Sequence, residues 1–362
     1  MNGYEDYFGI DDIDGFREQE ERREAQRRER SERCRIEAEK RQRKAGTTGF
    51  LKSRAFLSTV AVVIYVTAAV IILVLGNSAG KTVKQQEEAT IAANILDVPV
   101  YPADYDTVLK SADEVYNGFL ILVSNNYACR HDGIDLVNVS ENYNHKYQIT
   151  DYAVQANRTT LTAMDAMFLD FNEAVGDNDL MISCDYRSME LQQQLYDKEV
   201  EEKGEEEGSK WVAKPGHSEH QTGYAFDLTL RHEDGTISEF DGKGKYAWIE
   251  ENCEKYGFIV RYPDDKTDIT GIYHEPWHIR YVGVAHACYI KEHGLCFEEY
   301  IDTVKNYTAQ KPLEYQDCWM NRWQIYYAKA QGDQTSVPVP KGKEYEISGN
   351  NADGFIVSVK MS

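Results

Sequence analysis

The sequence lacks an excess of basic residues. Lysine and arginine together number 40 against 61 aspartate and glutamate residues in a chain of 362, so the formal net charge is −21. Because a general nucleic-acid binder neutralises phosphates with a basic surface, this balance excludes that class of protein. The sequence also has no internal repeat, and its 42% hydrophobic and 28% charged residues are typical of a globular protein. Its length allows about two domains.

The C-x-x-C spacing of a thiolate zinc site is also absent. Seven cysteines are present, and six of them follow residue 75: Cys129, Cys184, Cys253, Cys288, Cys296 and Cys318. An even number of cysteines in an oxidising compartment permits disulfides, but the sequence does not select the pairs. We interpret these six cysteines as structural, either disulfide-bonded or buried as thiols.

Residues 55–75 lack any charged side chain. A helix of this length rises roughly 31 Å, which matches the hydrocarbon core of a bilayer. A buried helix of a soluble protein would carry a polar stripe, and the apolar core of a signal peptide has only ~7–15 residues after a short basic start. The segment therefore predicts an uncleaved transmembrane helix at 55–75.

The two flanks of this predicted helix differ in charge. Residues 40–54 contain lysine and arginine but no acidic residue, whereas residues 76–94 carry both signs. The positive-inside rule then places residues 1–54 in the cytoplasm and everything after residue 75 outside the cell membrane. The cytoplasmic tail is almost entirely charged between residues 16 and 44 and has no apolar stripe. We interpret it as a solvated tail, with a partner-binding coil as the alternative.

The outer part alternates between segments typical of strands and of helices. Strands are predicted at 118–124, 180–184, 225–230, 258–262 and 279–282, and helices at 159–175, 188–203, 245–256 and 284–293. Because these segments show no regular βαβ rhythm, they favour an α+β fold. We place a polar connector at 76–101 and a single main domain at 102–310. Asn350, Asn351 and Gly354 supply turn residues between alternating β runs, so residues 311–362 form a small β appendage.

Two short stretches carry metal-binding side chains. Residues 218–228 (SEHQTGYAFDL) contain His220 and Asp227, and residues 275–283 (EPWHIRYVG) contain Glu275 and His278. A catalytic zinc ion takes three nitrogen or oxygen ligands and keeps one position for water, whose proton a free carboxylate nearby accepts. Two histidines and one aspartate supply such a set, and Glu275 is the spare carboxylate. Gly223 allows the chain to bend so that both members of the first pair face one centre.

Two further residues belong to this hypothesis. His217, three positions before His220, is an alternative ligand, the other interpretation being a histidine at the rim of the pocket. Arg187, in the stretch Tyr186-Arg187-Ser188 followed by Gln192, lies where a strand ends and a helix begins. Such an arginine could hold a substrate carboxylate or stabilise an oxyanion, although taken alone a surface arginine that caps a helix is the preferred interpretation.

Together, the stretches YRS-x3-Q, SEHQTGYAFD and EPWHIRYVG resemble the VanY-type D-alanyl-D-alanine carboxypeptidases, including the related LD-carboxypeptidases. The resemblance covers residues 102–307 and implies a zinc-peptidase domain with a small antiparallel sheet at the active site. It also implies a role for each of seven residues: His220, Asp227 and His278 as zinc ligands, Glu275 as catalytic base, Arg187 as the cation beside the oxyanion, and Gln192 and Ser218 as the lining of the substrate pocket. Anchoring of this family by an N-terminal helix in Gram-positive bacteria agrees with the predicted span.

The resemblance implies a membrane-anchored, extracellular zinc enzyme that removes the C-terminal D-alanine from peptidoglycan stem peptides with a metal-activated water. Three alternatives remain open: an LD-carboxypeptidase acting on tetrapeptide stems, an endopeptidase acting inside the stem, and a non-catalytic wall-binding module that keeps zinc for structure. The free carboxylate of Glu275 beside Arg187 argues against the last, because a structural zinc site has no use for a base. The sequence leaves the oligomeric state open.

Overall fold

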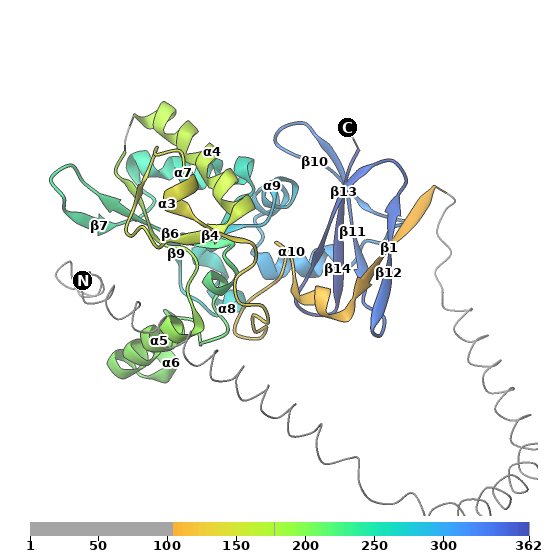
Figure 1. Ribbon diagram of the computed structural model, residues 1–362, viewed down its shortest axis with the longest axis horizontal. Coiled ribbons are helices and arrows are strands. Elements are labelled where there is room, and N and C mark those ends of the chain that lie inside the picture. Colours follow the sequence, from red (N-terminus) through yellow and green to blue (C-terminus); the bar gives the residue numbers. More distant parts are fainter. Residues whose placement is uncertain (1–103, 177, 362) are drawn as a thin grey trace, which may run out of the picture. The chain divides into compact units, whose positions relative to one another are not determined.

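The computed structural model describes residues 104–176 and 178–361 (Figure 1). Within these residues no helix has both the length and the apolar character needed to cross a bilayer. The predicted cytoplasmic tail, the transmembrane helix at 55–75 and the connector lie outside the described residues. They stay predictions.

The main domain is built on a six-stranded sheet. Its order is β3-β5-β6-β9-β8, with β7 pairing with β6. Strand β3 is parallel to β5, and the other neighbours are antiparallel. The strands are β3 (Gln148–Ile149), β5 (Leu180–Cys184), β6 (Ala225–Arg231), β7 (Ile237–Glu239), β8 (Phe258–Tyr262) and β9 (Glu275–Tyr281). A separate ladder joins β2 (Leu136–Asn138) to β4 (Gln155–Asn157).

Helix α4 (Arg158–Val175) covers one face of this sheet together with α7 (Ala247–Asn252) (Figure 1). The Asn157 side chain caps the start of α4 by accepting from two backbone amides, and Gly176 ends the helix in the left-handed conformation. Met164, Phe168 and other residues on one side of α4 are buried against the sheet. Apolar residues at helical spacing therefore form the first core of the domain.

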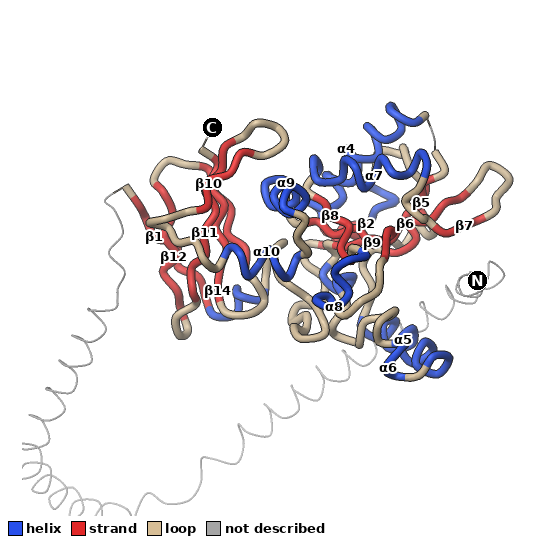
Figure 2. The backbone as a smooth tube through the Cα atoms, turned by 180° about the vertical axis from the view of Figure 1, so that it is seen from behind, coloured by secondary structure: helices blue, strands red, loops and turns tan. Residues whose placement is uncertain are grey.

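The remaining helices of the main domain are short or lie at its edges. Helices α5 and α6 lie on the side of the sheet away from α4 in both backbone views (Figure 2). The helices are α3 (Val139–Asn142), α5 (Met189–Lys203), α6 (Glu205–Gly208), α8 (Thr267–Thr270), α9 (Val284–His293) and α10 (Phe297–Val304). Short 3-10 turns occupy 112–116, 219–222, 244–246, 253–256 and 264–266.

The C-terminal residues form an antiparallel sheet of order β10-β11-β14-β13. Its strands are β10 (Leu313–Gln316), β11 (Arg322–Lys329), β13 (Glu344–Gly349) and β14 (Gly354–Lys360). Beside it, β12 (Gln334–Pro340) pairs with β1 (Tyr105–Ser111), so the first described strand joins the last part of the chain. A second core contains Phe297 and Tyr300 of α10 together with Ile325 and Ile356 of the C-terminal sheet. The C-terminal strands thus share a core with the main domain.

The mixed helix-and-sheet architecture is confirmed, and strands 180–184 and 258–262 and helix 284–293 have the predicted bounds. Four expectations need correction. Residues 118–124 do not form a strand, the helix predicted at 245–256 is three short helical turns, and α10 was not predicted. The strand expected at 279–282 begins earlier, at Glu275, so both Glu275 and His278 lie on β9.

The 118–124 segment shows why an apolar run is not always a strand. Its residues Leu120 and Val123 are fully buried, but its backbone bonds to loops and side chains instead of a neighbouring strand. The amide of Leu120 donates to Ser348 Oγ at 2.9 Å, and the Arg280 guanidinium donates to the carbonyls of residues 119 and 121. Buried backbone groups need a partner, and here side chains supply it.

Candidate metal centre and active site

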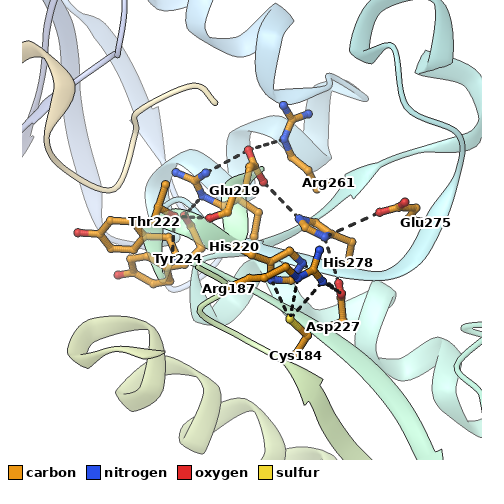
Figure 3. Close-up of polar contacts among 12 residues, drawn as sticks. Cys184, Arg187, Glu219, His220, Thr222, Tyr224, Asp227, Arg261, Glu275 and His278 are labelled. Atoms are coloured by element: carbon orange, nitrogen blue, oxygen red, sulfur yellow. Dashed lines mark hydrogen bonds and ion pairs between the residues drawn. The ribbon is translucent and has the colours of Figure 1, made fainter. Parts of the chain in front are cut away.

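Asp227 and His278 are brought together by the pairing of β6 with β9. The two residues are direct partners in this antiparallel ladder, so their side chains lie on the same face of the sheet. The Nδ1 atom of His278 is 3.1 Å from Asp227 Oδ1 (Figure 3). Two residues 51 positions apart in sequence thus form two of the three members of the predicted ligand set.

His220 reaches the same point from a 3-10 turn at 219–222 that leads into β6. Its Nε2 atom is 3.1 Å from Asp227 Oδ2. Gly223 closes the turn at φ 77°, and a Cβ atom there would lie 2.6 Å from the Leu136 side chain and 3.1 Å from the Asn157 amide nitrogen. The expected bend at Gly223 is therefore present. A side chain at this position would be strained by the positive φ and would collide with Leu136.

The three side chains are arranged as metal ligands would be. His220 Nδ1 is 2.7 Å from the carbonyl oxygen of Asp185, and His278 Nε2 is 3.4 Å from Glu219 Oε2. Each imidazole is thus anchored through one ring nitrogen and turns the other toward Asp227. A hydrogen bond from the outer ring nitrogen to a carbonyl or carboxylate sets the tautomer of a histidine ligand. The set of two imidazole nitrogens and one carboxylate fits a catalytic zinc ion.

Glu219 contacts the candidate site and was not among the residues predicted from the sequence. It is fully buried, and its Oε1 atom is 2.8 Å from Arg261 Nε and 3.0 Å from Arg280 Nη1. Burial opposes ionisation, but the two guanidinium groups outweigh it and hold the pKa of Glu219 well below its usual range. The residue stands beside His220 in the SEHQTG stretch, yet the arginines that make it an anchor for His278 are far away in sequence.

Glu275 opens strand β9 at the edge of the same cluster. Its Oε2 atom is 3.8 Å from His278 Nδ1 (Figure 3). Burial raises the pKa of Glu275 to about 7, although the nearby His278 opposes the shift. A carboxyl group with a pKa near neutrality both accepts and returns protons, which is what a general base requires.

Arg187 lies across the cluster from Glu275. Its Nη2 atom is 3.3 Å from Asp227 Oδ2, and its Nη1 atom donates to Gln192 Oε1 at 2.9 Å. Gln192 is buried at the start of α5 and donates in turn to the carbonyl of Ala213 at 2.7 Å. Ser218, also buried, precedes the 3-10 turn and accepts from the amide of residue 221 through its carbonyl. The structure therefore places Arg187 and Gln192 together and Ser218 at the start of the turn that carries His220.

Two other side chains refine the sequence-based picture. Cys184, which was interpreted as structural, lies in the cluster: its ligand atom and those of His220 and Asp227 fall within 4.8 Å of one another. Burial raises the pKa of the Cys184 thiol, but Arg187 and His220 outweigh it and lower the pKa to about 7. His217, the alternative ligand, directs Nδ1 to the carbonyl of Ser124 at 2.7 Å. The six cysteines of the described residues are free thiols.

Comparison with known proteins agrees with this geometry. Residues 153–284 match the family described as D-alanyl-D-alanine carboxypeptidase, VanY. A D-alanyl-D-alanine carboxypeptidase of Enterococcus faecium is 34% identical over 255 residues, which make up 68% of this chain and 77% of that protein. The chain belongs to the VanY family. VanY proteins are zinc peptidases, and this member is a zinc metallocarboxypeptidase.

Two further similarities support the assignment to the VanY family. The putative carboxypeptidase YodJ of Bacillus subtilis is 42% identical over 145 residues, which are 40% of this chain and 53% of that protein. The crystal structure of the vancomycin resistance D,D-dipeptidase VanXYg, in complex with a D-Ala-D-Ala phosphinate analogue, superposes with a TM-score of 0.64 and 34% identity. That similarity covers 71% of this chain and 99% of VanXYg. The fold is therefore shared beyond the matched motifs.

Proposed function

We propose that this VanY-family protein is a membrane-anchored, extracellular carboxypeptidase that removes the C-terminal D-alanine from peptidoglycan stem peptides. The observation that carries the proposal is the cluster of His220, Asp227 and His278 with Glu275 on one side and Arg187 on the other. A purely structural metal site would have no use for the base and the cation that flank this cluster.

Each side chain has a role that follows from its position. His220 Nε2, Asp227 and His278 Nδ1 would hold zinc, which when bound polarises the scissile carbonyl and makes water more acidic. Glu275 accepts the proton of the attacking water and returns it to the departing D-alanine amine. Arg187 places positive charge next to the oxygen of the penultimate carbonyl as that oxygen becomes anionic. Glu219 keeps His278 oriented throughout.

Replacement of Glu275 by glutamine tests the proposed base. Glutamine has a similar size but accepts no proton, so kcat/KM should fall by about 10² to 10⁴-fold. Zinc content, measured by elemental analysis, should stay at the level of the parent protein. Glu239→Gln, at an exposed position on β7, is the matched control. Release of D-alanine by the Glu275→Gln protein at the parent rate would show that Glu275 is not the base.

The substrate is tested with defined stem peptides. The purified full chain is incubated with pentapeptide and tetrapeptide stems, and the products are weighed by mass spectrometry. Loss of one D-alanine from the pentapeptide alone supports the proposal, whereas loss from the tetrapeptide supports an LD-carboxypeptidase. Cleavage inside the stem supports an endopeptidase, and binding without any product supports a wall-binding module.

Anchoring is a separate part of the proposal and rests on the apolar segment at 55–75. The full chain should be recovered with the membrane fraction of the cells that produce it, and its C-terminal part should be cut by protease added to intact cells. A chain that begins at residue 76 should leave the membrane fraction. Recovery of the full chain in the soluble fraction would contradict the anchor without affecting the catalytic proposal.

A further inference from the structure

Strand β5 ends in a β-bulge, which points the side chain of Cys184 toward the active site. Pairing with β6 is regular from Leu180 to Ile182, skips one residue, and resumes with Cys184 opposite Asp227. Without the bulge Ser183 would lie opposite Asp227, and Cys184 would point to the other face of the sheet, into the core beside Phe226. Bulges next to active sites commonly re-aim a side chain in this way.

The re-aimed thiol contacts the guanidinium group of Arg187. The Nε and Nη2 atoms of Arg187 are 3.3 Å and 3.1 Å from Cys184 Sγ, so two N–H groups along one edge of the guanidinium converge on a single sulfur (Figure 3). Nη1 on the other side donates to Gln192. The plane of the guanidinium is thus fixed from both sides, by sulfur on one edge and by an amide oxygen on the other.

We infer that Cys184 is the positioning residue for Arg187, a role that rests on the function proposed above. Asp227 Oδ2 also contacts Arg187, but this carboxylate is a proposed zinc ligand and shares its charge with the metal and with His220. Among the described contacts, Cys184 Sγ is the acceptor that Nε of Arg187 meets. The sulfur meets both N–H groups of this edge at one point, so it fixes the plane in which the guanidinium faces the proposed position of the substrate oxyanion.

Replacement of Cys184 by alanine or by serine separates its role in orienting Arg187 from its role in packing. In Cys184→Ala the Nε edge of Arg187 loses its acceptor, and we expect kcat to fall about tenfold with little change in KM, the size of effect typical of a hydrogen bond to a charged group. Cys184→Ser keeps an acceptor and should recover most of the lost kcat. Cys318→Ala, at an exposed cysteine, is the matched control and should behave like the parent protein.

A double-mutant cycle shows whether Cys184 acts through Arg187. In a protein that already carries Arg187→Ala, the Cys184→Ala change should have no further effect on kcat. An equal additional loss in that background, or full kcat in the single Cys184→Ala variant, would overturn the inference. So would loss of zinc from Cys184→Ala, measured by elemental analysis, because the thiol would then act on the metal instead.

These outcomes are distinct from failure of the proposed function. If the parent protein releases no D-alanine from any stem peptide, the proposed function is refuted. If the parent protein is active and Cys184→Ala is equally active, only the positioning role of Cys184 is refuted.

Discussion

At the residue scale, the site depends as much on the side chains behind the ligands as on the ligands themselves. Glu219 makes no direct approach to Asp227 or Glu275 in the described contacts, yet it fixes the ring of His278 and is itself held by two buried arginines. A buried carboxylate without partners would become neutral, whereas this one stays ionised. Its charge in turn makes the facing imidazole a better ligand.

Replacement of Glu219 by glutamine should weaken zinc binding about 10 to 100-fold, because the amide no longer offers His278 a charged acceptor. The measurement is the zinc dissociation constant by competition with a chelating dye. Glu298→Gln is the matched control: Glu298 pairs with Arg261 but has no described contact with His278. Equal losses in the two variants would mean that Glu219 acts only through general stability.

The sequence predicted the proposed reacting residues but not the side chains that hold them in place. His220, Asp227, Glu275, His278 and Arg187 were predicted from three short stretches, and the structure places all five in one cluster. Their assigned roles stay predictions. Glu219 and Cys184 were missed because their surroundings depend on long-range partners and on a bulge, and no local pattern reports either.

At the element scale, the least predictable feature is the buried segment 118–124. An apolar run of this length is typical of a strand, and nothing local shows that its hydrogen-bond partners include the side chains of Arg280, Ser348 and Asn351. Strands β5, β6 and β8 and the helix at 158–175 were predictable because their apolar residues follow the period of the element itself. The 118–124 segment has no periodic pattern of its own that would reveal its conformation.

Substitution of Asn351 tests how much the hydrogen bonds to this segment contribute to the free energy of unfolding. Its side-chain amide donates to the carbonyls of Leu122 and Ala128 at 2.8 Å and 3.0 Å, and its backbone has a φ of 61°. Asn351→Gly keeps the backbone conformation but leaves two carbonyls unpaired, so the free energy of unfolding should fall by about 1–3 kcal/mol. Asn351→Ala should lose about 1 kcal/mol more, because alanine disfavours positive φ.

Urea unfolding of both Asn351 variants measures this effect. If Asn351→Gly were as stable as the parent protein while Asn351→Ala were not, the backbone conformation alone would explain the presence of asparagine. The 118–124 segment would then be held mainly by its apolar burial.

At the scale of the whole molecule, the C-terminal strands and the main domain are joined by a shared core and by buried polar contacts. His286 on α9 is at the centre of one such contact: it hydrogen bonds to Tyr300 of α10, and its Nε2 atom is 2.8 Å from Ser358 Oγ on β14. Burial lowers the pKa of His286 to about 3. The β appendage at 311–362 was predicted from turn residues and alternating β runs, and neither feature carries information about a core shared with the main domain.

The free energy of unfolding should therefore fall at low pH, because the unfolded chain takes up a proton at His286 more readily than the folded protein does. The unfolded chain binds a proton at this histidine below pH ~6.5, whereas the folded protein resists protonation down to about 3, so folding is favoured above pH ~6.5 and weakened as the pH falls toward 3. The loss between pH 7 and pH 5 amounts to about 2 kcal/mol. His286→Gln should remove this part of the dependence, measured by urea unfolding at both pH values. Parallel losses in parent and variant would contradict the assignment.

The hydrogen bonds around residues 118–123 also constrain when the candidate active site can form during synthesis of the chain. Ser348 and Asn351 hold this early segment, the segment's carbonyls hold Arg280, and Arg280 holds Glu219 behind the proposed metal ligands. Residues 348–351 are synthesised after all the residues of the candidate site. A nascent chain that does not yet contain them therefore carries every reacting group without the frame that aligns these groups.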